Sequence, residues 1–438
     1  MKKYEKYKES GIKWLGAVPE HWQIKRIKNF LIDTNKVSVT GTEDLLTVSH
    51  ITGVTLRSEK NVNMFLAETN VGYKKCCPGD IIINTMWAWM GALGACKDAG
   101  ICSPAYNVYR PIPRIEYHAQ FFDYLFKTPN FIIEMTRYSK GIVSSRLRLY
   151  PREFYQIQSV IPPLSEQIAI ANYLDSKTQL IDRKIELLNN KISYYKELRR
   201  SLINKIVCRG LDDNVKLKES KIDWIGKIPG HWEVKRLKSI GNIETSSVDK
   251  KIKAGESLVK LINYTDVYNN KRKEIWNCNE YMIVSANEKQ IQSKRLIKGD
   301  VLFTPSSETI EDIGISSVVM EDLHNTLYSY HLLRFRLKQK GVVLGYRKYL
   351  FNNDLVQYYF SNNSIGTTRK ILGLNVFNNL LLLLPPSNEQ IKITKYLDAK
   401  TQNIDCIIKN LQQQIEKLQE LRKTLINDVV TGKIKVTE

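Results

Sequence analysis

The sequence lacks the patterns of disulfide-rich, zinc-binding and membrane-spanning proteins. Its 438 residues include only seven cysteines, which are scattered and form no CxxC pair. The longest purely aliphatic run, Leu380–Leu384, is far too short to cross a bilayer, and no signal-peptide core follows the polar start. We therefore expect a cytoplasmic protein in a reducing environment, with cysteines that fill its core.

Motifs for nucleotides and cofactors are also absent. There is no GxxxxGK[ST] phosphate loop and no glycine-rich turn between a strand and a helix. The Pro-Pro pairs that begin at Pro162 and Pro385 lack the flanking residues of an amino-methyltransferase site. His21 and His231 stand beside tryptophans, with no second ligand at metal spacing, so we expect packing and capping roles for them. We expect no catalytic residue, metal or cofactor in this chain.

Acidic residues are scarce relative to basic ones. Asp and Glu number 45 against 66 Lys and Arg, which gives a net charge of +21. This excess indicates a polyanionic partner, most simply nucleic acid, although an anionic membrane surface or solubility alone are alternatives. The length and the 43% hydrophobic content predict two or three domains with proper cores.

An internal repeat organises the chain. The stretch "GIKWLGAVPEHWQIKRIKNF" from Gly11 returns as "KIDWIGKIPGHWEVKRLKSI" from Lys221. A second block, "PPLSEQIAIANYLDSKTQLID" from Pro162, returns as "PPSNEQIKITKYLDAKTQNID" from Pro385. The segments between these blocks differ, apart from short matches such as "GDIIINT" with "GDVLFTP", each a Gly-Asp turn before an apolar strand. The two copies of one module thus share similar flanking blocks, which we call the frame. The segments between these blocks differ.

Each Pro-Pro block leads into a predicted long helix, the first from about 166 to 207. Apolar residues recur there at steps of four and three, as in a coiled-coil seam. The seam residues are Ile181, Ile185, Leu188, Ile192 and Tyr195, and in the second copy Ile404, Ile408, Leu411, Ile415 and Leu418. The same spacing continues through Leu198 and Leu421. Two such helices most simply pair with each other, and an antiparallel pair fits a pseudo-twofold repeat. Two separate amphipathic helices are the alternative.

The repeat predicts an α+β fold. Two similar mixed α/β domains, residues 1–162 and 211–385, are joined by two long helices, residues 163–210 and 386–438. We expect the helices to form an antiparallel coiled coil, which gives the chain a pseudo-twofold internal repeat.

Basic and hydroxyl side chains at corresponding points of the two copies are candidates for DNA contacts. Hydroxyls beside arginine suit phosphate binding, and arginine also reads guanine edges. The candidates are Lys25, Arg26, Lys74, Lys75, Ser144, Ser145, Arg146, Arg148, Lys235, Arg236, Lys294, Arg295, Thr367, Thr368, Arg369 and Lys370. For the basic residues after each tryptophan, a solvated strand end is an equally good interpretation.

The doubled motifs resemble those of a type I restriction–modification specificity (S) subunit. "WLGAVPEHWQIKRIK" and "WIGKIPGHWEVKRLK" enter the variable modules, "PPLSEQ" and "PPSNEQ" leave them, and "IANYLD" and "ITKYLD" open the helices. The resemblance covers essentially the whole chain. It implies two DNA target recognition domains, each of which reads one half of a bipartite, asymmetric site.

The resemblance also implies partners. The helices would dock two methyltransferase subunits, and a restriction and motor subunit would join them. S-adenosylmethionine, ATP and Mg²⁺ would belong to those subunits, and this chain would be non-catalytic. A duplicated basic coiled-coil scaffold, or an enzyme with a divergent nuclease or methyltransferase site, are the alternatives.

Overall fold

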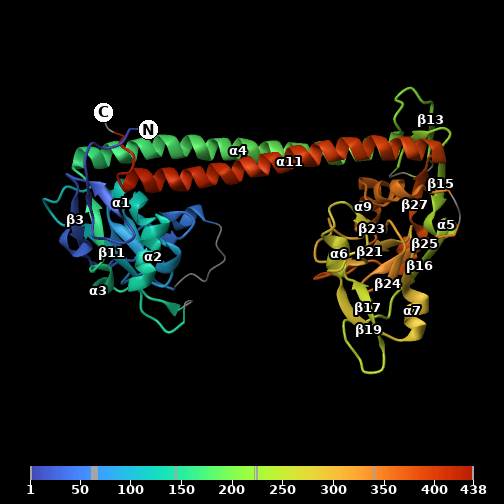
Figure 1. The fold of residues 1–438 in the computed structure, drawn as a ribbon, viewed down its shortest axis with the longest axis horizontal. Helices are drawn as coiled ribbons and strands as arrows, with labels where there is room; N and C mark the ends of the chain where they lie inside the picture. The colour runs from blue at the N-terminus through green and yellow to red at the C-terminus, as the bar shows by residue number, and fades with distance from the viewer. Residues whose placement is uncertain are drawn as a thin grey trace. The chain divides into compact units, whose positions relative to one another are not determined.

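The computed structural model describes residues 2–60, 68–143, 146–220, 222, 225–338 and 341–436. The chain forms two compact units, Met1–Asn189 with Gln412–Glu438, and Asn190–Leu411. Each unit holds one mixed α/β module, called module 1 and module 2, and parts of the long helices α4 (Leu164–Arg209) and α11 (Ser387–Val430) (Figure 1). The predicted fold class is confirmed.

Module 1 is built on a four-stranded antiparallel sheet in the order β4-β11-β8-β9. Its strands are β1 (Tyr7–Glu9), β2 (Ala17–Pro19), β3 (Gln23–Arg26), β4 (Leu31–Asp33), β5 (Leu46–Ser49), β6 (Gly53–Leu56), β7 (Lys74–Cys76), β8 (Ile81–Asn84), β9 (Leu93–Ala95), β10 (Gly100–Cys102), β11 (Tyr106–Pro111) and β12 (Gln158–Ile161). Its helices are α1 (Ala119–Phe126), α2 (Pro129–Tyr138) and α3 (Pro151–Phe154), with short 3₁₀ turns η1 (Ile27–Asn29), η2 (Arg57–Glu59) and η3 (Ala88–Met90).

Strand β8 shows why the sheet is buried on both faces. Alternate side chains of a strand point to opposite faces. Ile81 and Ile83 accordingly join the aromatic core that includes Phe122 of α1, whereas Ile82 packs in a second cluster with Cys76. A continuous run of β-branched residues therefore forms the central strand, as expected for a strand covered from both sides.

The cysteines follow the expectation only in part. Cys76, Cys96 and Cys102 are buried in module 1, and all seven cysteines are free. Cys77 and Cys406, however, are exposed. Cys77 directly follows a buried neighbour on an extended chain, so its side chain points to the opposite side. Cys406 lies on the polar face of α11.

Module 2 has two larger sheets, one of five strands in the order β16-β25-β21-β23-β18 and one of four in the order β19-β17-β24-β20, beside two-stranded ones. Its strands are β13 (Leu217–Glu219), β14 (Lys227–Pro229), β15 (Glu233–Arg236), β16 (Gly241–Thr245), β17 (Ser257–Ile262), β18 (Glu274–Ile275), β19 (Met282–Ala286), β20 (Arg295–Leu296), β21 (Val301–Phe303), β22 (Ser306–Ser307), β23 (Ser316–Val319), β24 (Leu323–Tyr328), β25 (Leu333–Leu337), β26 (Lys370–Ile371) and β27 (Leu381–Leu384). Its helices are α5 (Leu237–Ile240), α6 (Tyr264–Tyr268), α7 (Glu288–Lys294), α8 (Arg347–Phe351), α9 (Asp354–Asn362) and α10 (Leu374–Asn379), with the 3₁₀ turn η5 (Leu344–Tyr346).

The opening block of each module pairs with the strand that directly precedes its Pro-Pro pair. In module 1, β3 of the opening block runs antiparallel to β12, which precedes the Pro-Pro pair. In module 2, β15 pairs with β27 in the same way. This pairing holds the two ends of each variable segment together next to the start of a long helix. The variable segments can therefore differ while the frame is the same in both modules.

The two long helices run in opposite directions, because α4 begins and α11 ends in the same unit. In that unit, Arg422 Nε lies 2.9 Å from Asp182 Oδ1, and in the other unit Arg199 Nε lies 3.1 Å from Asp405 Oδ1. All ten predicted seam residues are buried or half-buried. Within the described ranges, no helix is long and apolar enough for a membrane span.

The seam departs from the predicted spacing at one point in each helix. Leu198 is 40% exposed and Leu421 is 50% exposed, so neither belongs to the covered stripe. In the first helix the covered stripe instead continues four residues after Tyr195, at Arg199. In the second helix it likewise continues at Arg422 rather than at Leu421. Both arginines form ion pairs across the helices, which explains why the stripe passes through them rather than the leucines.

Candidate nucleic-acid interface

A glutamate in the first turn of each long helix binds the opening block of its module. Glu166 accepts hydrogen bonds from Trp22 Nε1 at 3.0 Å and from the Tyr4 hydroxyl at 2.8 Å. His21 Nε2 lies 2.5 Å from the same carboxylate. The corresponding residues of module 2 are Glu389, Trp232 and His231. Both tryptophans are fully buried, whereas both histidines are largely exposed and cap this contact, so the repeated His-Trp pair is part of the frame.

The Gly-Asp turn is a second part of the frame. Asp80 accepts from the Cys77 backbone N–H at 2.8 Å and from Arg110 of β11 through Nε and Nη2, at 2.8 and 2.7 Å. Gly79 has a φ of 93°, which favours glycine before this turn. The equivalent residues in module 2 are Gly299, Asp300, Ile297 and Arg336. Both aspartates are about 1% exposed, so each buried charge is paired with the arginine of a neighbouring strand.

The basic residues of the opening blocks lie on the frame strands. Lys25 and Arg26 are the last residues of β3, and Lys235 and Arg236 are the last residues of β15. Lys235 forms an exposed ion pair with Glu233 at 2.7 Å. The two arginines are exposed to solvent at the ends of these strands.

The segments that carry Arg146 and Arg369 are closed by backbone hydrogen bonds in each module. Hairpin 1 is defined by the described residues 140–143 and 146–148 and is closed by two backbone hydrogen bonds of 2.8 Å between Lys140 and Arg148. Arg146 is exposed on it and Arg148 is half-buried. The predicted Ser144 and Ser145 lie outside the described residues.

Hairpin 2 spans residues 365–371 and is closed by hydrogen bonds between Ile365 and Ile371. Its candidates are exposed or half-buried: Thr367, Thr368, Arg369 and Lys370. Arg369 Nε donates to Ser306 Oγ at 3.2 Å. No carboxylate in the described ranges forms an ion pair with a basic side chain of either hairpin, so their positive charge is available to a ligand.

The structure brings each hairpin next to the loop that follows the Gly-Asp strand. Leu149 N donates to the Thr85 carbonyl at 3.2 Å, and Leu372 N donates to the Pro305 carbonyl at 2.8 Å. Thr85 follows β8 directly, and Pro305 lies just beyond β21. Two segments far apart in sequence thus form one surface in each module, with the frame beneath it.

Aromatic residues on these loops were missed by the sequence analysis. Trp87, which is 47% exposed, lies between His50 and Trp89 with ring centroids 6.5 Å from each and nearly parallel planes. In module 2, Tyr264 reaches the same kind of loop through its hydroxyl, which donates to the Ser306 carbonyl at 3.0 Å. Two tryptophans in "NTMWAWM" directly after an apolar strand were the available signal.

The remaining candidates are partly neutralised by carboxylates. Lys75 pairs with Glu43 at 3.0 Å, and Lys294 lies 3.7 Å from Glu244. A hydrogen bond from Ser38, the backbone amide and Lys75 together lower the pKa of Glu43 to about 2. Lys74 is half-buried on β7 and Arg295 is exposed on β20. The hairpins therefore offer more unpaired charge than these positions do.

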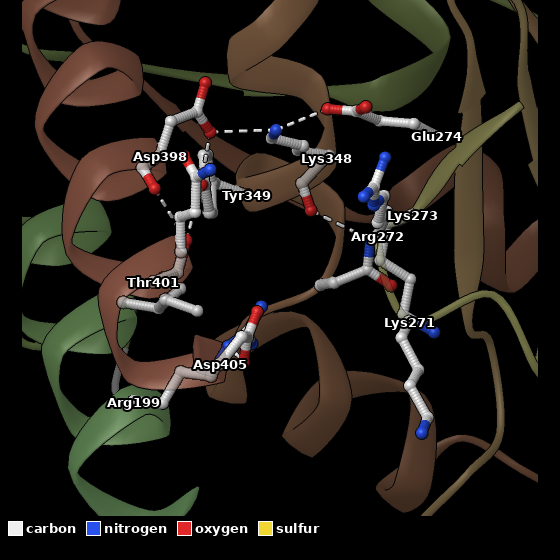
Figure 2. A pocket seen from close by; sticks show the side chains of 13 residues that line it. Arg199, Lys271, Arg272, Lys273, Glu274, Lys348, Tyr349, Asp398, Thr401 and Asp405 are labelled. Atoms are coloured by element: carbon white, nitrogen blue, oxygen red, sulfur yellow. Dashed lines mark hydrogen bonds and ion pairs between the residues drawn. The ribbon is translucent and has the colours of Figure 1, made fainter. Parts of the chain in front are cut away.

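A cavity of about 520 Å³ lies in the second unit against both long helices (Figure 2). Lys348 of α8 bridges Glu274 at 2.5 Å and Asp398 of α11 at 2.8 Å. Burial, together with the positive charge of Arg199, lowers the pKa of Lys273, the neighbour of Glu274, to about 8. None of the predicted DNA-binding residues lines this cavity, and its ion pairs attach module 2 to α11.

Clusters of at least three His, Cys, Asp or Glu side chains that could hold a metal ion are absent from the described part of the chain. The two buried carboxylates of the Gly-Asp turns are saturated by arginine and backbone donors. The exposed hairpin side chains and the aromatic residues beside them can bind a ligand through cations, hydroxyls and aromatic faces.

The fold has two modules joined by long helices, and comparison with known proteins shows which family the chain resembles. Residues 229–417 match the family described as type I restriction modification DNA specificity domain. The MjaVIII specificity subunit of Methanocaldococcus jannaschii is 25% identical over 65% of this chain and 63% of its own length. The EcoKI specificity subunit of Escherichia coli is 24% identical over 65% of this chain and 59% of its own. These matches span less than two thirds of either relative.

Longer matches extend over the whole chain. The putative MjaX specificity subunit of Methanocaldococcus jannaschii is 22% identical over 98% of both chains. The fold resembles a chain solved in work on complex assembly and conformational transition of the type I R-M system, with a TM-score of 0.72, 14% identity and coverage of 95% of this chain and 99% of that one. The HsdS subunit from Thermoanaerobacter tengcongensis gives a TM-score of 0.54 at 15% identity, over 97% of this chain and 100% of its own. The chain is therefore similar in sequence to type I restriction enzyme specificity subunits and shares its fold with the HsdS subunit.

Proposed function

We propose that this chain gives a type I restriction–modification complex its DNA sequence specificity. Each module reads one half of a bipartite, asymmetric site, and partner subunits carry out methylation and cleavage. The observation that carries the proposal is the doubled frame, which holds an unpaired basic hairpin on each of two otherwise different modules. Different modules on equal frames suit the reading of two different half-sites.

The hairpins supply the chemistry of the proposed contacts. Arg146 and Arg369 occupy equivalent positions, are exposed and have no carboxylate partner among the described residues. Arginine binds phosphate or guanine bidentately, so these two positions are proposed as the first DNA contacts of each module. Of the other candidates, the lysines held by Glu43, Glu233 and Glu244 are proposed to contribute less.

The proposed partners are two methyltransferase subunits and a restriction and motor subunit. The equivalent frames of the two modules, each beside the start of one long helix, offer two similar docking surfaces. S-adenosylmethionine, ATP and Mg²⁺ are proposed to bind those partners, so this chain is itself non-catalytic. The seven free cysteines suit the reducing cytoplasm in which such a complex would meet DNA.

Methylome sequencing tests the proposed function directly. A host that carries this chain with its methyltransferase partner is compared with the same host lacking only this chain. We expect one asymmetric, bipartite methylated motif that disappears with the chain. An unchanged methylome, together with DNA retention that shows no sequence preference, would contradict the proposal and favour a basic scaffold.

Substitution of the two hairpin arginines tests the proposed interface. If each contacts a phosphate, Arg146→Ala and Arg369→Ala each lower the salt slope of binding by about one unit. If either reads a base, discrimination at one position of its half-site falls by about 1–3 kcal/mol. Fluorescence anisotropy at several salt concentrations measures both effects.

The control for the arginine variants is Arg137→Ala. Arg137 is an exposed arginine of module 1, but Glu134 holds its guanidinium at 2.6 Å. We expect its removal to leave the salt slope unchanged. Wild-type affinity and slope in both hairpin variants would exclude Arg146 and Arg369 from the interface.

A further inference from the structure

Each hairpin exposes an isoleucine at an equivalent position of the repeat. Ile142 is 104% exposed on hairpin 1, and Ile365 is 70% exposed on hairpin 2. Each precedes the hairpin arginine by the same number of residues. A second exposed aliphatic side chain accompanies each, Val143 at 51% and Ile371 at 48%.

The repetition of this feature needs a physical reason. A single exposed apolar side chain is common on a protein surface. Here, however, the exposed side chain recurs at aligned positions of two modules whose surfaces otherwise differ. The hairpins also differ in closure, since Lys140 and Arg148 close the first and Ile365 and Ile371 close the second. The shared frame therefore does not by itself dictate an apolar side chain at both points.

The neighbours of these isoleucines indicate the ligand. Arg146 and Arg369 are exposed and unpaired within the described residues, and Arg148 and Lys370 add further charge. A protein interface usually needs a larger contiguous apolar patch with few charges in its centre. An apolar side chain flanked by cations is instead typical of proteins that insert a wedge between base pairs while the cations bind the backbone.

We propose that Ile142 and Ile365 act as wedges that insert between adjacent base pairs, one in each half-site. This inference rests on the proposed function and adds a specificity mechanism to it. Base steps that unstack easily accept a wedge at lower cost than stiff steps do. Each module would then select sequence at its wedge position through deformability, without a hydrogen bond to a base.

The test uses the full-length chain and duplexes of the motif that methylome sequencing yields. 2-Aminopurine replaces one base at a time, and its fluorescence rises where stacking is lost. We expect a rise at one step in each half-site with the wild-type chain. Ile142→Ser should abolish the rise in one half-site only and weaken binding about tenfold, the effect of losing one buried aliphatic side chain. Ile365→Ser should act on the other half-site only.

Matched controls separate insertion from general loss of an exposed aliphatic residue. Ile168→Ser on α4 and Ile391→Ser on α11 remove side chains that are 38% and 56% exposed on the long helices, and should leave both signals intact. Ile142→Leu and Ile365→Leu, which keep an aliphatic wedge, should restore the rise.

Two results would overturn the wedge. One is sequence-specific binding by the wild-type chain with no rise at any position, which leaves the proposed function standing. The other is a full rise in both serine variants. Binding without any sequence preference would instead overturn the proposed function and the wedge together.

Discussion

Module 1 and module 2 attach to their long helices through the same side chains. The Tyr124 hydroxyl donates to Asp175 of α4 at 2.6 Å, and the Tyr349 hydroxyl donates to Asp398 of α11 at 2.5 Å. Gln167 and Gln390 each donate to the carbonyl of the first proline of their Pro-Pro pair at 2.8 Å. Together with the hydrogen bonds of Glu166 and Glu389 and those of the Gly-Asp turns, these contacts form one set that is present in both modules.

Away from this attachment the modules diverge. Module 2 has a second sheet of four strands, whereas the further sheets in the described part of module 1 have two strands each. Lys348 precedes Tyr349 where Asp123 precedes Tyr124. Lys348 bonds to Asp398 of α11, whereas Asp123 binds Lys127 and the Ala95 backbone inside its own module. Polar contacts to buried partners are thus kept in both copies, while the surfaces that face a ligand are free to change.

The largest effects should come from the Gly-Asp turns. Asp80→Ala and Asp300→Ala each leave a half-buried arginine and a backbone N–H without their acceptor, which costs up to about 3–5 kcal/mol. We expect each variant to destabilise its own module alone. Hydrogen exchange followed by mass spectrometry would locate the loss. Equal loss of protection in both modules would show that they do not unfold separately.

The glutamates of the long helices should give the next largest effect. Glu166→Ala leaves Trp22 Nε1 buried without an acceptor and removes about 1–3 kcal/mol. Glu389→Ala should cost less, because among the described residues Glu389 accepts no tyrosine hydrogen bond like that of Tyr4 to Glu166. Urea denaturation monitored by tryptophan fluorescence compares the two variants. A larger loss for Glu389→Ala would contradict the ranking.

Because Lys273 loses its proton there, we expect module 2, but not module 1, to become more stable in mildly alkaline solution. The pKa of Lys273 is lowered from 10.5 to about 8 by burial and by Arg199, so its charge opposes folding below pH 8. As the pH rises from about 8 to 10.5, the folded state loses this proton first and the penalty fades. Lys273→Met should therefore stabilise module 2 at pH 7, with an advantage that shrinks towards pH 10.5. Thermal denaturation across this range measures it, and a pH-independent advantage would exclude the titration.

The smallest effect is expected from the ion pairs between the helices. The pairs Asp182–Arg422 and Arg199–Asp405 are partly exposed, so breaking either should cost about 0–1 kcal/mol. Arg422→Met and Arg199→Met should behave alike in helix protection against hydrogen exchange. A large difference between them would show that the two halves of the helix pair are not equivalent.

The frame and the long helices could be predicted because they are repeated in the sequence. The partners of Asp80 and Asp300 could not, since Arg110 and Arg336 lie some thirty residues later in the divergent segments. Nor could the sequence tell a free lysine from a paired one, because the distance between Lys75 and Glu43 depends on the tertiary fold. The exposed leucines of the seam escaped prediction because arginine stands in their place on the covered stripe.

The two ion pairs between the helices have a consequence for how such a chain can arise. Asp182 and Arg199 lie on α4, and Asp405 and Arg422 lie on α11 at the same separation. Each helix therefore contributes one aspartate and one arginine to the two ion pairs. A helix of this kind is complementary to an antiparallel copy of itself. A gene half this long would encode one module with a helix able to form an isologous dimer. Duplication and fusion of such a gene would free the two halves to acquire different specificities.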